Sequence, residues 1–131
     1  LAHAILRGSI SKHGINVPNY HYEDLERLHQ MYAKSNLENM ALIIDCNHSN
    51  SGKNYLEQRR ICKEVLHSCR HNADIGNMVK GFSLVKGVMI ESYLVDGNQK
   101  VGEGVYGKSI TDACLGWEKS KELILEIADL V

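Results

Sequence analysis

The chain has 131 residues, 44% of them hydrophobic and 24% charged, and 15 basic side chains nearly balance 16 acidic ones. This balance excludes the strong positive field of proteins that bind nucleic acid or anionic membranes. Every apolar run is shorter than the roughly 18 residues that a membrane-spanning helix needs. The four cysteines lack the spacing of a zinc site and suit a reducing compartment. We therefore expect a cytoplasmic protein with no nucleic-acid or membrane partner.

Three apolar runs, each followed by a loop and a helix-like segment, are predicted to form strands. They are Ala4–Leu6, Ala41–Ile44 and the end of the stretch Phe82–Ile90. This alternation is typical of βα units on a parallel sheet, so the predicted class is α/β. Without an internal repeat or a linker, residues 1–131 are predicted to form one compact segment.

Three helices are predicted from apolar residues that recur at helical spacing. The first covers Tyr22–Ser35 and places Leu25, Leu28, Met31 and Tyr32 on one stripe. The second covers Leu56–His71, and a turn region follows over Asn72–Gly81. The last begins at Asp112, bends near Gly116 and carries Leu123, Ile124, Ile127 and Val131 inward.

Polar residues follow the predicted strands at the point where chemistry is expected. Arg7, His48 and Glu91 each come after an apolar run, and Asp112 lies farther along the loop after the third strand. Because parallel strands end at the same edge, these side chains are expected to converge. One imidazole and two carboxylates suit a divalent transition ion, whether manganese, iron, cobalt or zinc. Taken singly, each residue is more often a loop hydrogen-bonding group or a helix cap than a metal ligand.

Five motifs in this order resemble one known family. They are Ile5-Leu6-Arg7-Gly8, Pro18-Asn19-Tyr20, Ile43–Ser51, Gly87–Gln99 and Tyr106–Trp117. The chain resembles, over nearly its whole length, the C-terminal part of a class I 3-deoxy-D-arabino-heptulosonate 7-phosphate (DAHP) synthase, also called phospho-2-dehydro-3-deoxyheptonate aldolase. The resemblance implies a TIM (β/α)8 barrel. Such a barrel takes about 250 residues, so this chain would hold about three βα units and would need a missing N-terminal part.

The resemblance also implies an activity and a set of site residues. The family condenses phosphoenolpyruvate with erythrose 4-phosphate, releases phosphate and opens the shikimate route to aromatic amino acids. His48, Glu91 and Asp112 would be metal ligands, with His48 also catalytic and Asp112 also in contact with substrate. Arg7 would bind the phosphate of phosphoenolpyruvate, because a guanidinium group matches phosphate bidentately. The family's essential lysine and its cysteine ligand lie upstream.

Other neighbours of the motifs are weaker candidates. Asp45 is expected to orient a ligand or an arginine rather than to bind metal, and Lys53 and Lys108 could add positive potential. Cys46 occupies a position that the family does not use as a ligand. Arg7 could instead form an internal ion pair.

Two departures from the family pattern and two alternatives complete the prediction. Ser9 replaces a usual glycine, and Ile10–Val17 forms a longer loop, which affects the expected phosphate end of the site. Tyr93 replaces a common histidine.

The chain could be a non-catalytic fragment or half-barrel that works only by assembly, with itself as a homo-oligomer or with the missing part. A sibling synthase that uses arabinose 5-phosphate is disfavoured by the tract Gly107–Cys114.

Overall fold

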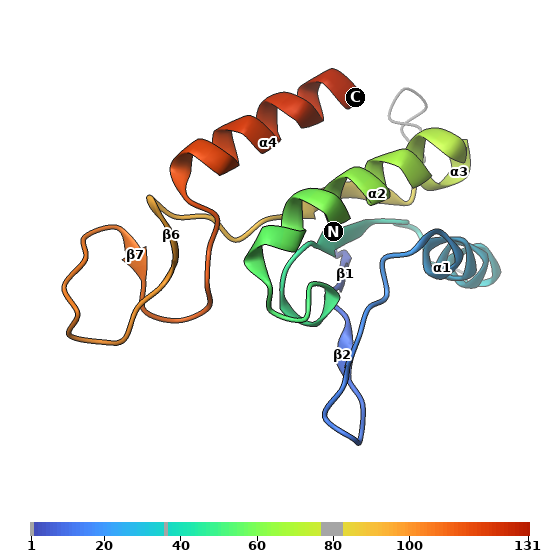
Figure 1. The fold of residues 1–131 in the computed structure, drawn as a ribbon. Coiled ribbons are helices and arrows are strands. Elements are labelled where there is room, and N and C mark those ends of the chain that lie inside the picture. The colour runs from blue at the N-terminus through green and yellow to red at the C-terminus, as the bar shows by residue number, and fades with distance from the viewer. Residues whose placement is uncertain (1, 36, 77–82) are drawn as a thin grey trace.

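A parallel sheet of three strands forms the centre of the computed structural model, which describes residues 2–35, 37–76 and 83–131 (Figure 1). The strands are β1 (Ala4–Leu6), β4 (Leu42–Asp45) and β5 (Val85–Met89), in the order β1-β4-β5. Their register pairs Leu6 with Ile44, and Asp45 with Met89. All three strands therefore end at the same edge of the sheet.

Helices cover one face of this sheet. They are α1 (Tyr22–Lys34), α2 (Gln58–His71), α3 (Ala73–Gly76) and α4 (Trp117–Leu130). Leu42 and Ile44 of β4 point into a core that also holds Leu25, Ile61 and Leu123 from the long helices. Each of these side chains is fully buried, and burying one leucine stabilises the fold by about 1.5–3 kcal/mol.

The other face of the sheet has less cover. Ile5 of β1 is 45% exposed, and its register partner Ile43 is only half-buried. Because side chains alternate along a strand, these two residues point away from the helices that bury Leu42 and Ile44. The sheet thus has one apolar face packed against helices and one that is partly open.

Two smaller strand pairs extend from the sheet. The antiparallel hairpin of β2 (Ser9–Ile10) and β3 (Asn16–Val17) follows β1 and projects away from the helices (Figure 1). The arm of β6 (Val95–Asn98) and β7 (Lys108–Ser109) lies between β5 and α4. Two single-turn 3-10 helices, η1 (His48–Asn50) and η2 (Tyr55–Glu57), lie between β4 and α2.

The predicted strands and the first two helices agree with the structure to within a few residues. The predicted start of the last helix at Asp112 is wrong, because α4 begins at Trp117 with Gly116 as its N-cap. Residues before it pair with other backbone: the N–H of Leu115 donates to Glu91 O at 3.0 Å. The predicted turn region contains α3, while residues 77–82 lie outside the described residues.

Three side chains predicted to face the core are exposed instead. Met31, Ile124 and Val131 are all more than half exposed, whereas Leu123 is buried and Ile127 packs against the core. Ile124 follows Leu123 directly and so lies about 100° around the helix from it. Within the described residues, the helices are too short or too polar to cross a membrane.

Candidate metal site

The strand ends bring the predicted site residues to one edge of the sheet. Arg7 follows β1 directly, His48 lies three residues beyond the end of β4, and Glu91 lies two beyond β5. Asp112 reaches the same place from the loop after β7, because Leu115 pairs with the backbone of Glu91 and Tyr93. The convergence expected for these four residues is present.

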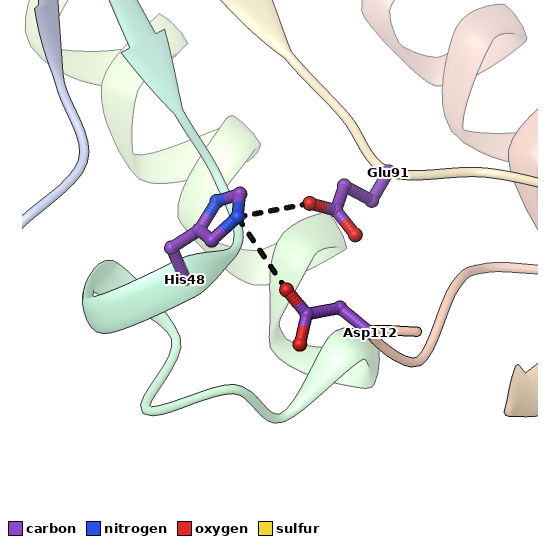
Figure 2. Close-up of side chains that lie close together, drawn as sticks. All are labelled: His48, Glu91 and Asp112. Atoms are coloured by element: carbon purple, nitrogen blue, oxygen red, sulfur yellow. Dashed lines mark ion pairs between the residues drawn. The ribbon is translucent and has the colours of Figure 1, made fainter. Parts of the chain in front are cut away.

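Three side chains place one potential ligand atom each around a common point (Figure 2). His48 Nε2 lies 3.1 Å from Glu91 Oε1 and 3.6 Å from Asp112 Oδ2, and all three ligand atoms lie within 4.8 Å of one another. Ligand atoms about 2.1 Å from one metal ion are separated by roughly 3.0–3.4 Å in tetrahedral or octahedral coordination. The separations from His48 Nε2, at 3.1 Å and 3.6 Å, are close to this range.

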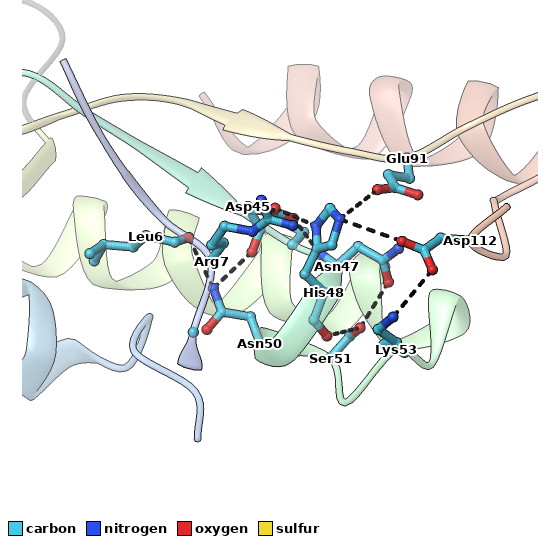
Figure 3. A network of polar contacts seen from close by, with 12 residues as sticks. Leu6, Arg7, Asp45, Asn47, His48, Asn50, Ser51, Lys53, Glu91 and Asp112 are labelled. Carbon is cyan, nitrogen blue, oxygen red and sulfur yellow. Dashed lines mark hydrogen bonds and ion pairs between the residues drawn. The ribbon is translucent and has the colours of Figure 1, made fainter. Parts of the chain in front are cut away.

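The charge arrangement around His48 also fits a cation. Asp45 Oδ2 lies 2.6 Å from His48 Nδ1 (Figure 3), so Nδ1 donates its proton to this carboxylate, while Nε2 faces Glu91 and Asp112. A nitrogen lone pair facing two carboxylates is electrostatically unfavourable unless a second proton or a cation lies between them. A carboxylate, an imidazole and a metal in line is a common arrangement in metal sites.

The carboxylate of Asp45 is buried and both of its oxygens accept hydrogen bonds. Its side chain is 1% exposed, and Oδ1 accepts a hydrogen bond from the Asn47 N–H at 2.8 Å. A buried carboxylate is costly unless its oxygens are paired. The structure therefore agrees with the expectation that Asp45 orients its neighbours and does not itself face the cluster.

The backbone of His48 has an uncommon conformation. Its φ is +45°, in the left-handed region that non-glycine residues seldom adopt. Its carbonyl accepts the Lys53 N–H at 2.8 Å and the Ser51 hydroxyl at 3.2 Å. These bonds offset a conformational cost of about 1–3 kcal/mol, and the conformation directs the ring toward the cluster.

Arg7 lies beside the cluster with most of its side chain accessible. Its Nε is 3.9 Å from Asp45 Oδ2, and the side chain is 57% exposed. Such a long, exposed ion pair holds the guanidinium group only weakly, so its donors remain available to an anion. Lys53 adds a second positive charge beside the cluster, with Nζ 3.4 Å from Asp112 Oδ1. Lys108, the other lysine considered from the sequence, lies in strand β7.

Two asparagines fix the backbone on either side of Arg7. The Gly8 N–H donates to Asn19 Oδ1 at 2.8 Å, and the Asn19 N–H donates to Asn50 Oδ1 at 2.9 Å. Asn50 Nδ2 in turn donates to Leu6 O at 3.1 Å (Figure 3). The Pro18-Asn19-Tyr20 motif and the loop after β4 thus secure the place where Arg7 leaves β1.

Two cysteines near the site, Cys46 and Cys114, have thiol pKa values raised above the ordinary value. Burial is the main cause that raises the pKa of Cys114, whose Sγ contacts Asp112 O. A hydrogen bond with Cys62, together with burial, raises the pKa of Cys46. Cys46 is thus paired with a thiol of α2.

Sequence reasoning gave no role to Asn47, Asn50 or Gln58, which are all buried here. The position of Asn47 and Asn50 in the loop that follows a buried strand was an available signal. Gln58 offered none, because a polar residue in the first turn of a helix is usually exposed to solvent.

The fold and this site define the class of the protein: an α/β protein with a His–carboxylate cluster at the carboxyl ends of parallel strands. The chain belongs to the DAHP synthetase I family, whose family model matches residues 2–125. The resemblance found in the sequence motifs is thereby confirmed.

Individual relatives agree with this assignment. The phospho-2-dehydro-3-deoxyheptonate aldolase of Haemophilus influenzae is 36% identical over 132 residues, covering 98% of this chain and 32% of that protein. The Trp-sensitive enzyme of the same name from Enterobacter agglomerans is 39% identical, covering 98% and 33%. The solved structure of this aldolase from Francisella tularensis matches with a TM-score of 0.78 at 30% identity, covering 97% of this chain and 33% of that one. The chain spans about a third of the length of these relatives.

Proposed function

We propose that this chain is the C-terminal segment of the catalytic barrel of a DAHP synthase, which condenses phosphoenolpyruvate with erythrose 4-phosphate and releases phosphate. The observation that carries the proposal is the cluster of His48, Glu91 and Asp112 beside Arg7 in a member of this family. Divalent metal and anionic phosphate would both find matching groups at one edge of the sheet. The expected compartment of such an enzyme is the cytoplasm.

A partial TIM barrel is the architecture that we propose for the chain. In α/β proteins the parallel sheet is normally covered on both faces, yet Ile5 and Ile43 lie on a face that the described residues leave partly open. Among the described residues, β1 and β5 each pair on one side only. The remaining strands and helices of a (β/α)8 barrel would continue the sheet at these edges and enclose the open face.

The proposed roles follow from the geometry of each side chain. His48, Glu91 and Asp112 would hold a divalent manganese, iron, cobalt or zinc ion, with the cysteine of the missing part as a further ligand. When bound, such an ion supplies Lewis-acid polarisation of a carbonyl oxygen. Asp45 keeps the proton on Nδ1 of His48, so that Nε2 stays a ligand.

The substrates would meet the charged groups around this cluster. Arg7 would hold the phosphate of phosphoenolpyruvate and orient it, which lowers the entropic cost of the bond-forming step. Asp112 and its partner Lys53 lie on the opposite side of His48 from Asp45 (Figure 3), where they would contact the aldehyde substrate. The carbon–carbon bond forms between the enol carbon and the aldehyde, water adds to the adjacent carbon, and phosphate leaves.

Assembly is the second candidate function, favoured by the partly open face of the sheet. A half-barrel without the upstream lysine and cysteine would act only after docking with the missing part, or would associate with copies of itself.

The choice of aldose substrate separates a DAHP synthase from the sibling synthase that uses arabinose 5-phosphate. Parallel assays with erythrose 4-phosphate and with arabinose 5-phosphate would distinguish the two enzymes.

The substitution Glu91→Gln in the full-length protein tests the proposed function. It keeps the shape of the side chain and removes the ligand charge, so we expect metal affinity and turnover to fall at least about 100-fold. Saturation with either substrate should not restore turnover. Metal content and phosphate release are the two measurements.

The matched control is Glu118→Gln, which neutralises an exposed carboxylate in the first turn of α4. This variant should retain both metal and turnover. Undiminished turnover in Glu91→Gln would exclude Glu91 as a ligand.

A further inference from the structure

We propose that Gln58 is a positioning residue for the candidate metal site, because its side-chain amide holds the backbone of Glu91 on both sides of the Cα atom. The inference rests on the proposed function in one respect, since it takes Glu91 to be a metal ligand. Gln58 itself lies in α2 and contributes no atom to the His48, Glu91 and Asp112 cluster.

The contact between the two residues is a pair of hydrogen bonds. The Glu91 N–H donates to Gln58 Oε1 at 2.7 Å, and Gln58 Nε2 donates to Glu91 O at 3.0 Å. This amide therefore acts as a strand partner would, just beyond the end of β5. Strand β5 ends at Met89, where its pairing with β4 stops. Two residues later, the side chain of Gln58 supplies the hydrogen-bond partners for the backbone of Glu91.

The burial of Gln58 shows that this contact is specific. Its side chain is fully buried, although its neighbours Arg59 and Arg60 in the first turn of α2 are exposed. Burying an amide costs free energy unless its donor and acceptor are both satisfied. The donor and the acceptor of the Gln58 amide both bond to the backbone of Glu91, whose side chain is a candidate metal ligand.

The contact between Gln58 and Glu91 also affects the position of Asp112. Glu91 O accepts a further hydrogen bond from the Leu115 N–H at 3.0 Å, and the Tyr93 N–H donates to Leu115 O at 2.8 Å. Leu115 lies three residues after Asp112 on the same segment. Gln58 thus fixes the carbonyl on which the Asp112 segment is docked, so it sets the spacing between Glu91 and Asp112.

A purely structural role for Gln58 makes a different prediction. If the amide only joins α2 to the end of β5, its loss should lower the stability of the fold and leave the metal affinity of the folded molecules unchanged. If it positions the ligands, metal affinity should fall in molecules that are still folded. Groups that support metal ligands typically change metal affinity by about 10- to 100-fold when removed.

The experiment titrates the metal-free, full-length protein with Co²⁺ and follows the ligand-field absorption of the bound ion. Gln58→Met keeps the length of the side chain and removes both hydrogen bonds. We expect Co²⁺ to bind about 10- to 100-fold more weakly per folded molecule, with an altered absorption band. Urea unfolding of the metal-free protein gives the folded fraction and the change in stability.

Val65→Ala is the control for stability, because Val65 is also fully buried on α2 but packs in the apolar core. This variant should be less stable than the wild type and should bind Co²⁺ with the same affinity. Wild-type affinity in folded Gln58→Met would overturn the inference.

A second variant covers the case in which Gln58→Met does not fold. Gln58→Asn keeps a buried amide but is one methylene shorter, so it cannot reach both backbone groups of Glu91. It should also weaken Co²⁺ binding, and wild-type affinity in this variant would overturn the inference. If Glu91→Gln binds Co²⁺ like the wild type, the proposed metal site itself fails. If only the Gln58 variants bind normally, the positioning role alone fails.

Discussion

At the scale of single residues, Asp45 shows how one buried carboxylate can organise several functional groups. Its two oxygens accept from the Asn47 N–H and from His48 Nδ1, and the guanidinium of Arg7 lies close by. Its negative charge favours a proton on Nδ1 of His48, which would leave Nε2 as the ligand atom, and it attracts the guanidinium group proposed to hold phosphate. The proposed metal ligand His48 and the proposed phosphate-binding residue Arg7 therefore both contact Asp45.

The substitution Arg7→Lys in the full-length protein separates these two parts. Lysine keeps the positive charge but loses the planar pair of donors that matches phosphate. Because a hydrogen bond to a charged group contributes about 1.5–3 kcal/mol, we expect KM for phosphoenolpyruvate to rise by roughly tenfold or more. Steady-state kinetics and metal analysis are the measurements, and metal stoichiometry should stay intact.

Arg27→Lys is the matched control, since Arg27 pairs with Asp24 on the exposed surface of α1. Loss of metal from Arg7→Lys with an unchanged dependence on phosphoenolpyruvate would instead identify Arg7 as part of a structural ion pair.

The sequence predicted the residues of the candidate site better than the groups that hold them. Arg7, His48 and Glu91 could be found because each follows an apolar run, and this position is a local property of the chain. The approach of Asp112 depends on the pairing of Leu115 with Glu91, which no local pattern encodes. Whether these residues bind metal and substrate stays a prediction.

At the scale of elements, the junction between β1 and the loop after β4 depends on a close backbone approach. Gly8 has φ +72°, and a Cβ atom placed on it would lie 2.8 Å from Ser49 Cβ and 2.9 Å from the backbone nitrogen of Asn50. A side chain at this position would therefore meet both backbone strain and a steric clash. Glycine allows β1 and η1 to pack together beside Arg7.

Gly8→Ala should destabilise the protein by more than the cost of the left-handed conformation alone. That cost is about 1–2 kcal/mol for alanine, and the clash adds to it because the nearby atoms include backbone. Gly14→Ala is the matched control, since Gly14 has φ +77° and open space around it. Urea unfolding of both variants gives the difference, and equal destabilisation would show that the close approach of β1 to η1 is unimportant.

Helical periodicity predicted which segments form helices, but less reliably which side chains become buried. Leu25 and Leu123 lie in the core as expected, whereas Met31 and Ile124 on the same helices are exposed. Burial depends on which elements pack against a helix, and this is settled by contacts between distant parts of the chain. The start of α4 depends likewise on the pairing of residues 114 and 115 with the segment around Glu91 and Gly97.

At the scale of the whole molecule, the two faces of the sheet differ in how far they are covered. One face is packed against α1, α2 and α4, while the row that contains Ile5 and Ile43 is partly open. Apolar side chains on an open face and unpaired strand edges favour association. The isolated chain should therefore behave differently from the same chain within a completed barrel.

We expect the isolated 131-residue chain to self-associate or to remain loosely packed, and to show no turnover. Mixing it with a separately prepared upstream part should restore phosphate release if the two parts dock. Light scattering gives the mass in solution, and a phosphate assay before and after mixing gives the activity. A well-folded monomer that converts both substrates unaided would contradict the partial-barrel proposal.

The hairpin of β2 and β3 has a consequence for how this part of the protein can change. Its tip is bonded to itself, with the Ser11 N–H donating to Ile15 O at 2.8 Å and the Gly14 N–H donating to Ser11 O at 2.9 Å. Its two ends are joined below the tip by the bond from Gly8 to Asn19. An insertion at the tip would lengthen a loop that closes on itself, at little entropic cost and without breaking the bond from Gly8 to Asn19. We expect insertions at the tip to be tolerated better than changes at its two ends, where β2 and β3 contact η1.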